Sequence, residues 1–302
     1  MTVSGISRLT IDSLNGMLNP CRICPRVCGV NRLAGTGGYC QAGRLARVSS
    51  YQQHFGEEPF LVGQYGSGTI FFARCNLGCV FCQNYDISHH GVGRDVETAD
   101  LVQMILDLQS LGCHNINLVS PTPWVPQVVE ALAEARDGGL KLPTVYNTGG
   151  YDSVETLRQL EGIIDIYMPD LKYADNETGR RWSGVPDYWD VVRPALKEMH
   201  RQVGDLEVRS GIARRGLLVR HLVMPGGIEA SRQCFEFLAR EVSAQTVVNV
   251  MDQYHPAGEA GRFPGLDRDL SVSEYRQALD HLTGAGLPRH PDLYPVRETR
   301  RS

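Results

Sequence analysis

The sequence predicts an α/β protein in which six parallel strands alternate with helices. Two observations lead to this prediction. Apolar residues make up 42% of the 302-residue chain, which is enough for a sizeable core. From about residue 68 onward, short β-branched runs alternate with stretches of helical periodicity, as expected of parallel strands covered on both faces. Six such units form either a partial (β/α) barrel or a doubly wound sheet. In both folds the functional groups gather where the strands end.

The predicted strands are short and nearly continuous in apolar residues. They span residues 69–73, 116–119, 144–146, 163–168, 217–223 and 246–251. Helical periodicity follows most of them. In the first helix Leu101, Ile105 and Leu108 share one face, with Thr98 as the expected N-cap and Gly112 as the expected stop. Further helices are expected over residues 125–136, 153–160, 186–203, 230–242 and 273–282.

Charge and hydropathy exclude several classes of protein. The chain has 30 basic and 34 acidic residues, a formal net charge of −4, which argues against a nucleic-acid partner. No run approaches 18 consecutive apolar residues, so we expect no membrane-spanning helix. The N-terminus has no basic head followed by an apolar run, as a signal peptide would. These features together predict a cytoplasmic protein.

The first 50 residues differ in composition from the rest of the chain. They carry six arginines, one acidic residue (Asp12) and four of the nine cysteines. We therefore predict two parts. Residues 1–67 would form a cysteine-rich module and its lead-in, and residues 68–302 the barrel with a C-terminal helical tail.

Three cysteines directly follow the first predicted strand. Cys75, Cys79 and Cys82 are spaced C-x3-C-x2-C. Grouped cysteines in a reduced compartment are interpreted first as metal or cluster ligands. Three thiolates can hold three irons of a 4Fe-4S cluster and leave the fourth iron open to a small molecule. The alternative, a structural zinc site, needs a fourth ligand, for which His89 or His90 is available.

This loop, with the aromatic Phe81 before the last cysteine, resembles that of the radical S-adenosylmethionine (SAM) superfamily. From about Thr69 to His255 the chain also resembles the pyruvate formate-lyase activating enzymes, and most of all their uncharacterised iron–sulfur homologues. The matching segments are Cys75-Asn76-Leu77-Gly78-Cys79, Asn147-Thr148-Gly149, Asp170-Leu171-Lys172, Arg220 with Val223-Met224-Pro225-Gly226, and Tyr254-His255.

The resemblance implies a partial (β/α)6 barrel of TIM type that binds a 4Fe-4S cluster and SAM, with Cys75, Cys79 and Cys82 as the catalytic cluster ligands. It implies cleavage of SAM to a 5′-deoxyadenosyl radical that abstracts a hydrogen atom from a glycine of a protein or peptide. The implied partners are a reductant such as flavodoxin or ferredoxin and a glycyl radical enzyme. Two alternatives stay open: radical modification of another substrate, and a non-catalytic iron–sulfur or zinc protein that transfers electrons or acts as a scaffold.

The resemblance also implies a set of cofactor-binding residues. Asn147, Thr148, Met168 and Asp170 would meet the methionyl end of SAM, directly or through a monovalent cation. Lys172 lies on the same side of an extended chain as Asp170, so the pair would position the cofactor carboxylate or a substrate, or form an ion pair at the rim.

Two further residues follow the later strands. Arg220 is a charge inside an apolar run, which favours an anionic partner in the cavity or a nearby aspartate. His255, after the sixth strand, would meet the adenosine or cap its own loop.

The second strand departs from the family pattern. Many relatives carry Gly-Gly-Glu there to hold the cofactor amino group, whereas this chain carries Ser120-Pro121-Thr122. Ser120 and Thr122 provide the only side-chain oxygens at that point. Asn147 stands where the activating enzymes tend to have an aspartate.

Four cysteines in the first 50 residues form a second group. Cys21, Cys24, Cys28 and Cys40 are spaced C-x2-C-x3-C-x11-C, and the glycine-rich stretch 35–38 lets the chain turn back toward the first three. Four thiolates can hold zinc or a second 4Fe-4S cluster, and the absence of any metal stays a third alternative. The two remaining cysteines, Cys113 and Cys234, are expected in the core.

Overall fold

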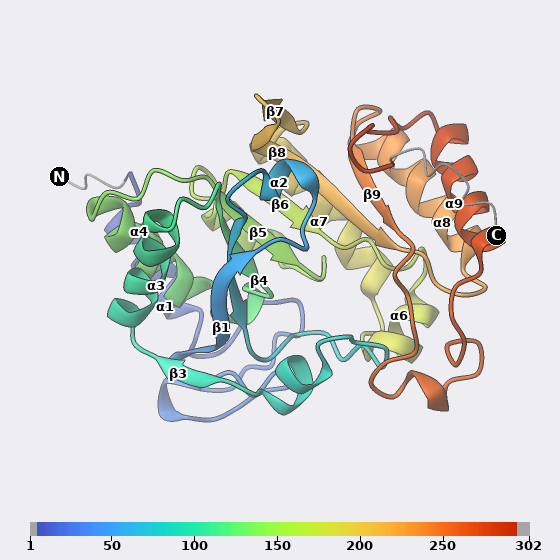
Figure 1. The fold of residues 1–302 in the computed structure, drawn as a ribbon. Coiled ribbons are helices and arrows are strands. Elements are labelled where there is room, and N and C mark those ends of the chain that lie inside the picture. The colour runs from blue at the N-terminus through green and yellow to red at the C-terminus, as the bar shows by residue number, and fades with distance from the viewer. Residues whose placement is uncertain (1–4, 295–302) are drawn as a thin grey trace.

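The computed structural model describes residues 5–294, and six parallel strands form the centre of its sheet (Figure 1). These strands pair in chain order. They are β2 (Ser67–Phe72), β4 (Ile116–Val119), β5 (Thr144–Thr148), β6 (Ile166–Pro169), β8 (Ile212–Leu222) and β9 (Val247–Met251). Within the described residues β9 does not pair with β2, so the barrel stays open. The predicted partial (β/α)6 barrel is confirmed.

Three antiparallel strands extend this sheet. They are β1 (Ala46–His54) on β2, β3 (Arg94–Val96) on β1, and β7 (Glu207–Arg209) on β8. The sequence analysis does not predict them because they are largely polar and half-exposed. Only one side of the first half of β1 is buried, and its second half reads Tyr-Gln-Gln-His.

The predicted helices are present within a few residues of their expected ends. They are α3 (Thr98–Ser110), α4 (Val125–Asp137), α5 (Val154–Gln159), α7 (Tyr188–Val203), α8 (Ile228–Phe237) and α9 (Val272–Gly284). The expected N-cap Thr98 is wrong, because Glu97 caps α3 in a reciprocal capping box with Asp100. The single helix expected over 230–242 is α8 followed by a π-helical turn, Leu238–Val242.

Other short elements complete the fold. The sequence analysis does not predict the helices α1 (Arg8–Gly16), α2 (Pro59–Val62) and α6 (Asn176–Ser183). Three 3-10 turns, at Arg32–Ala34, Thr122–Trp124 and Ala260–Arg262, and a π-helical turn at Asp86–His90 lie in the loops. No helix in residues 5–294 is both long enough and apolar enough to cross a bilayer.

The N-terminal segment packs on the barrel rather than apart from it. Helix α1 contacts α4 and α5, and β1 is hydrogen-bonded to β2 along its length. Strand pairing therefore crosses the proposed boundary at residue 67, which remains a prediction from composition. In Figure 1 the blue loop after α1 and the cyan loop after β2 lie along the same lower edge of the sheet.

Helix α2 fills the inside of the open barrel. Its buried side chains Phe60 and Leu61 share a core cluster with inward-facing residues of β5, β6, β8 and β9. Those residues are Val145, Ile166, Met168, Leu218 and Val247. A second, larger cluster packs the outward-facing strand residues against the surrounding helices. Because side chains alternate along a strand, Asn147, Asp170 and Arg220 continue the inward-facing rows.

Removing the α2 plug should destabilise the fold. We expect Phe60→Ala to lower the free energy of unfolding by about 3–5 kcal/mol, because Phe60 is only 1% exposed and truncation leaves a cavity inside the barrel. Phe55→Ala is the matched control. Phe55 is 62% exposed, so its loss should change stability by no more than about 0.5 kcal/mol. Urea unfolding measures both, and equal effects would show that α2 does not support the barrel.

Candidate active site

The loop after β2 carries Cys75, Cys79 and Cys82 at the carboxyl end of the sheet. Each sulfur has a polar neighbour. The Leu77 N–H points at Cys75 Sγ (3.4 Å), Ser183 Oγ lies 3.0 Å from Cys79 Sγ, and Ser88 Oγ donates to Cys82 Sγ (3.2 Å). Because groups that can donate hydrogen bonds surround the sulfurs, the loop is suited to hold them as thiolates.

The three thiols also lie close to one another. Burial raises the pKa of Cys75 to about 12, and the negative charges of Cys79 and Cys82 add to the rise. Burial likewise raises the pKa of Cys79, with Lys172 acting in the opposite direction. Thiolates in such a place need a positive charge, and iron supplies one. The donor set therefore fits a cluster.

The described residues hold no ready-made site for a single metal ion. Among residues 5–294, no three His, Cys, Asp or Glu side chains are placed to coordinate one ion. His89, considered above as a fourth zinc ligand, stacks on Tyr85 (ring centroids 3.9 Å apart) and is bonded to Ser88 (2.8 Å). In a 4Fe-4S cluster each cysteine binds a different iron, so the sulfurs stand further apart than around one zinc.

The end of β5 forms the wall beside this loop. A Cβ at Gly149 would lie 2.6 Å from Leu77 Cδ1, and one at Gly150 only 2.3 Å from the Asp170 carbonyl oxygen. Glycine at both positions therefore lets three segments approach closely. In the part of the chain that the structure describes, no protein group is hydrogen-bonded to the amide of Asn147, which is 9% exposed. That amide is available to a ligand.

The end of β6 carries a half-buried ion pair that faces the cysteine loop. Lys172 Nζ lies 2.5 Å from Asp170 Oδ2. Burial alone would lower the pKa of Lys172, but Asp170 and Cys79 outweigh it and raise this pKa. Tyr188 fixes the turn, since it accepts from the Lys172 N–H (2.9 Å) and donates to the Asp170 carbonyl (3.2 Å). Lys172 thus places a positive charge near the cysteines.

Thr122 and Thr148 point to a buried carboxylate. Both hydroxyls donate to Asp152, at 2.8 and 2.7 Å, and Tyr146 also donates to it (3.1 Å). Burial raises the pKa of Asp152, and these hydrogen bonds counter the rise. These hydrogen bonds therefore hold the segments after β4 and β5 next to each other. The role of Thr122 and Thr148 in binding SAM stays a prediction. In this structure their hydroxyls are hydrogen-bonded to Asp152 instead.

Arg220 also has protein partners. It pairs with Glu57 and Glu58, which directly precede α2, and its two hydrogen bonds to Glu58 are 2.8 and 2.7 Å long. Asn249 donates to the same Glu58 carboxylate (2.7 Å). Burial raises and Arg220 lowers the pKa of Glu58, and the net direction is down, so the carboxylate is charged. The expected anionic partner in the cavity is thus supplied by the chain itself, from the opposite, amino-terminal side of the barrel.

The remaining predicted residues fall into two groups. Phe81 and Met168 are buried, and Phe81 packs its ring against Tyr173 and Tyr254. Ser120 and His255 lie at the rim. Ser120 has a left-handed φ of 57° and donates its N–H to the Asn147 carbonyl. His255 is exposed, and its ring lies 3.5 Å from the amide of Gln83, the residue after Cys82.

Sequence reasoning missed three supporting residues: Ser183, Asp152 and Asn76. Ser183 ends α6, where Asp175 as N-cap and Gly184 as stop are the signals that could have located the helix. Asp152 follows Thr148 by four residues, in the loop before α5. Asn76 donates to the Tyr151 carbonyl (2.6 Å) and accepts from Arg26 at its own carbonyl (2.6 Å).

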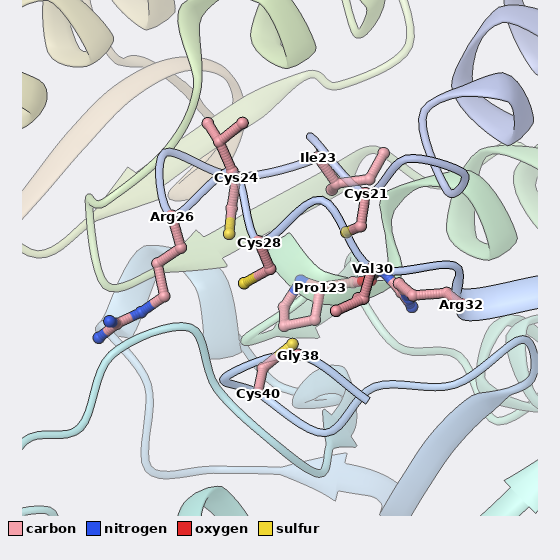
Figure 2. A pocket seen from close by; sticks show the side chains of 11 residues that line it. Cys21, Ile23, Cys24, Arg26, Cys28, Val30, Arg32, Gly38, Cys40 and Pro123 are labelled. Atoms are coloured by element: carbon pink, nitrogen blue, oxygen red, sulfur yellow. Dashed lines mark hydrogen bonds between the residues drawn. The ribbon is translucent and has the colours of Figure 1, made fainter. Parts of the chain in front are cut away.

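The four N-terminal cysteines line one pocket (Figure 2). Their sulfur atoms point toward a shared space, with Pro123 and Gly38 beside it. Burial raises the pKa of Cys24 to about 12, and Cys40, Cys28 and Cys21 each add to the rise. The residues whose spacing predicts a common site are thus neighbours in space. Cys113 and Cys234 are buried elsewhere in the core.

Comparisons with known proteins agree with this site. Residues 69–213 match the profile of the radical SAM superfamily. The chain is 31% identical over 281 residues to the uncharacterized protein MJ0674 of Methanocaldococcus jannaschii, a match covering 90% of this chain and 77% of that protein. The crystal structure of SuiB from Streptococcus suis is similar with a TM-score of 0.50 and 13% identity, over 74% of this chain and 49% of SuiB.

A second solved structure, anSMEcpe with bound AdoMet, matches with a TM-score of 0.47 and 12% identity, over 70% of this chain and 57% of that one. The chain spans about half the length of these two solved proteins. It belongs to the radical SAM superfamily. Membership implies an enzyme that uses a 4Fe-4S cluster and SAM, and the cysteine loop described above fits that cluster.

The close approach at Gly150 can be tested directly. We expect Gly150→Ala to lower the free energy of unfolding by about 1–3 kcal/mol more than Gly139→Ala. Both glycines have a positive φ, 81° and 98°, so both variants incur comparable backbone strain. Only Gly150 would also clash, because no atom lies within 4 Å of a Cβ at Gly139. Equal losses in urea unfolding would contradict the contact with Asp170.

Proposed function

We propose that this protein is a radical SAM enzyme that removes a hydrogen atom from a glycine of a protein or peptide, in the manner of the glycyl-radical activating enzymes. The observation that carries the SAM chemistry is the meeting of the cysteine loop with the ends of β5 and β6, through Leu77 on Gly149 and Lys172 beside Cys79. When bound, the cluster supplies the electron that cleaves SAM to 5′-deoxyadenosyl.

The chain's own residues bind and orient the cofactor in this proposal. Cys75, Cys79 and Cys82 ligate the cluster, and the Asn147 amide is available to the methionyl end of SAM. Lys172 offsets negative charge at the cysteines. The ring of Phe81, packed on Tyr173 and Tyr254, keeps water from the inner side of the loop.

The glycine substrate is supported by the sequence resemblance and by the shape of the rim. Beside the cysteine loop, Gln83 and His255 are exposed, and Cys75 and Cys82 are only partly covered. A chain segment from a second protein can approach such an edge. The electron donor in this proposal is a low-potential protein such as flavodoxin or ferredoxin.

Loss of the three cysteines tests the SAM chemistry. The anaerobic wild-type protein, supplied with SAM and a strong reductant, should form 5′-deoxyadenosine. The Cys75→Ala/Cys79→Ala/Cys82→Ala variant should form none, because no ligand for the cluster remains in that loop. Cys113→Ala is the control, since Cys113 is buried outside both cysteine groups and the variant should retain activity. Product measured by chromatography in the triple variant, or its absence in the wild type, would contradict the proposal.

An isotope experiment tests the substrate. A peptide with α-deuterated glycine should transfer deuterium to 5′-deoxyadenosine, because the Cα–D bond breaks as the bond at the 5′ carbon forms. The glycyl radical left behind should give a paramagnetic resonance signal. Mass spectrometry decides the outcome. If 5′-deoxyadenosine forms without deuterium from any glycine peptide or candidate partner protein, the radical chemistry stands and the glycine substrate is wrong.

A further inference from the structure

The four N-terminal cysteines surround a pocket that also holds a buried cation. Arg32 lines this pocket and is 1% exposed. Its guanidinium donates to the carbonyl oxygens of Pro123 (2.6 Å) and Gly43 (2.9 and 3.2 Å). Within residues 5–294 it has no carboxylate partner. A buried charge without a counter-charge is costly, so the pocket is built for an anion.

Four neutral thiols would not supply that anion. Four thiolates around zinc, or around an oxidised 4Fe-4S cluster, carry a net charge of about −2. Either would compensate Arg32. The third alternative, a pocket of free thiols, leaves the guanidinium uncompensated and is the least favoured.

The placement of the ligands bears on the choice between the two metal alternatives. Four zinc ligands must all reach one ion at about 2.3 Å, which brings their sulfurs together around a point. No three of the described Cys, His, Asp or Glu side chains meet that requirement. In Figure 2 the four sulfurs point from different sides toward one shared space. The loop that carries Cys75, Cys79 and Cys82 is likewise not arranged for one ion, and in the radical SAM superfamily that loop holds a 4Fe-4S cluster.

We propose that Cys21, Cys24, Cys28 and Cys40 bind a second 4Fe-4S cluster, next to Arg32, that relays electrons to the cluster of the radical loop. The relay role rests on the proposed function, whereas the cluster itself does not. All four iron positions are filled by protein ligands, so this cluster has no open site for substrate.

Contacts between the two cysteine loops place the sites side by side. Arg26, between Cys24 and Cys28, donates to the carbonyl of Asn76, the neighbour of Cys75 (2.6 Å). Tyr39, the neighbour of Cys40, stacks under the Arg26 guanidinium at 3.2 Å. Its hydroxyl would lie 2.1 Å from a Cβ at Gly78, the neighbour of Cys79. Neighbours of the ligands thus touch directly at two points.

The relay step is a simple one-electron exchange. A low-potential flavin or iron–sulfur protein is oxidised by one electron as the second cluster is reduced. The second cluster is then reoxidised as the radical-loop cluster is reduced. No bond forms or breaks and no proton moves, so the step balances with the electron donor named above.

Metal analysis of the wild-type protein tests the second cluster without any variant. The anaerobically purified full chain should contain about eight irons and eight sulfides, and no zinc, because each cluster holds about four of each. About four irons with one zinc would overturn the proposal. About four irons alone, after reconstitution with excess iron and sulfide, would overturn it as well.

Two variants assign the iron to its sites. The Cys75→Ala/Cys79→Ala/Cys82→Ala variant should lose half of the iron and keep a reducible cluster that SAM does not perturb. Cys24→Ala/Cys28→Ala should also lose half, while Cys113→Ala/Cys234→Ala, two buried cysteines outside both groups, should lose none. Complete loss of iron in the first variant, with circular dichroism unchanged, would overturn the second site whether or not the protein cleaves SAM.

Reduction kinetics test the relay. In the wild type, reduced flavodoxin or ferredoxin should produce the paramagnetic signal of the radical-loop cluster. In Cys24→Ala/Cys28→Ala that signal should be lost with the protein donors and retained with titanium(III) citrate, a small reductant that needs no relay. If flavodoxin or ferredoxin reduced the radical-loop cluster equally in the wild type and in Cys24→Ala/Cys28→Ala, the relay role would be wrong. The iron counts would still decide whether the second cluster exists.

Discussion

The rest of the structure depends on filling the inside of an open barrel. Six parallel strands leave a gap between β9 and β2, and the lead-in closes the interior from the amino-terminal side with Phe60 and Leu61 of α2. Glu57 and Glu58 enter with them and neutralise Arg220 of β8. With the amino-terminal half of the barrel occupied, only the carboxyl ends of the strands remain for a cofactor. The cysteine loop lies at those ends.

Local pattern was enough to predict the parallel strands and six of the helices. The strands are nearly continuous runs of apolar residues, because parallel strands are buried on both faces. The helices show apolar residues at helical spacing, because one face of each packs on the sheet. The pattern fails for β1 and α6, which are rich in polar residues and held by neighbours rather than by an apolar stripe. Arg220 shows a second limit, because its partner Glu58 lies 162 residues earlier and no periodicity connects them.

The candidate site divides in the same way. Cysteine spacing predicts both groups of thiols, since ligands to one centre must be close in the chain or brought back by a turn. It does not predict what the hydroxyls of Thr122 and Thr148 do, because the buried Asp152 that holds them depends on how β4 and β5 end side by side. Nor does it predict Ser183, which reaches Cys79 from a helix 104 residues further on.

The electrostatics of the thiols explain why both cysteine groups are suited to ligation rather than to covalent catalysis. A nucleophilic cysteine needs a lowered pKa and access to solvent. In Cys24 and Cys75, burial and neighbouring thiols instead raise the pKa to about 12, which disfavours a free thiolate. Positive groups stand beside each set, Lys172 near Cys79 and Arg32 near Cys40. These cations favour an anionic centre over neutral thiols. Two thiol sets, each with a cation beside it and with direct contacts between their loops, therefore lie together along a single edge of the sheet.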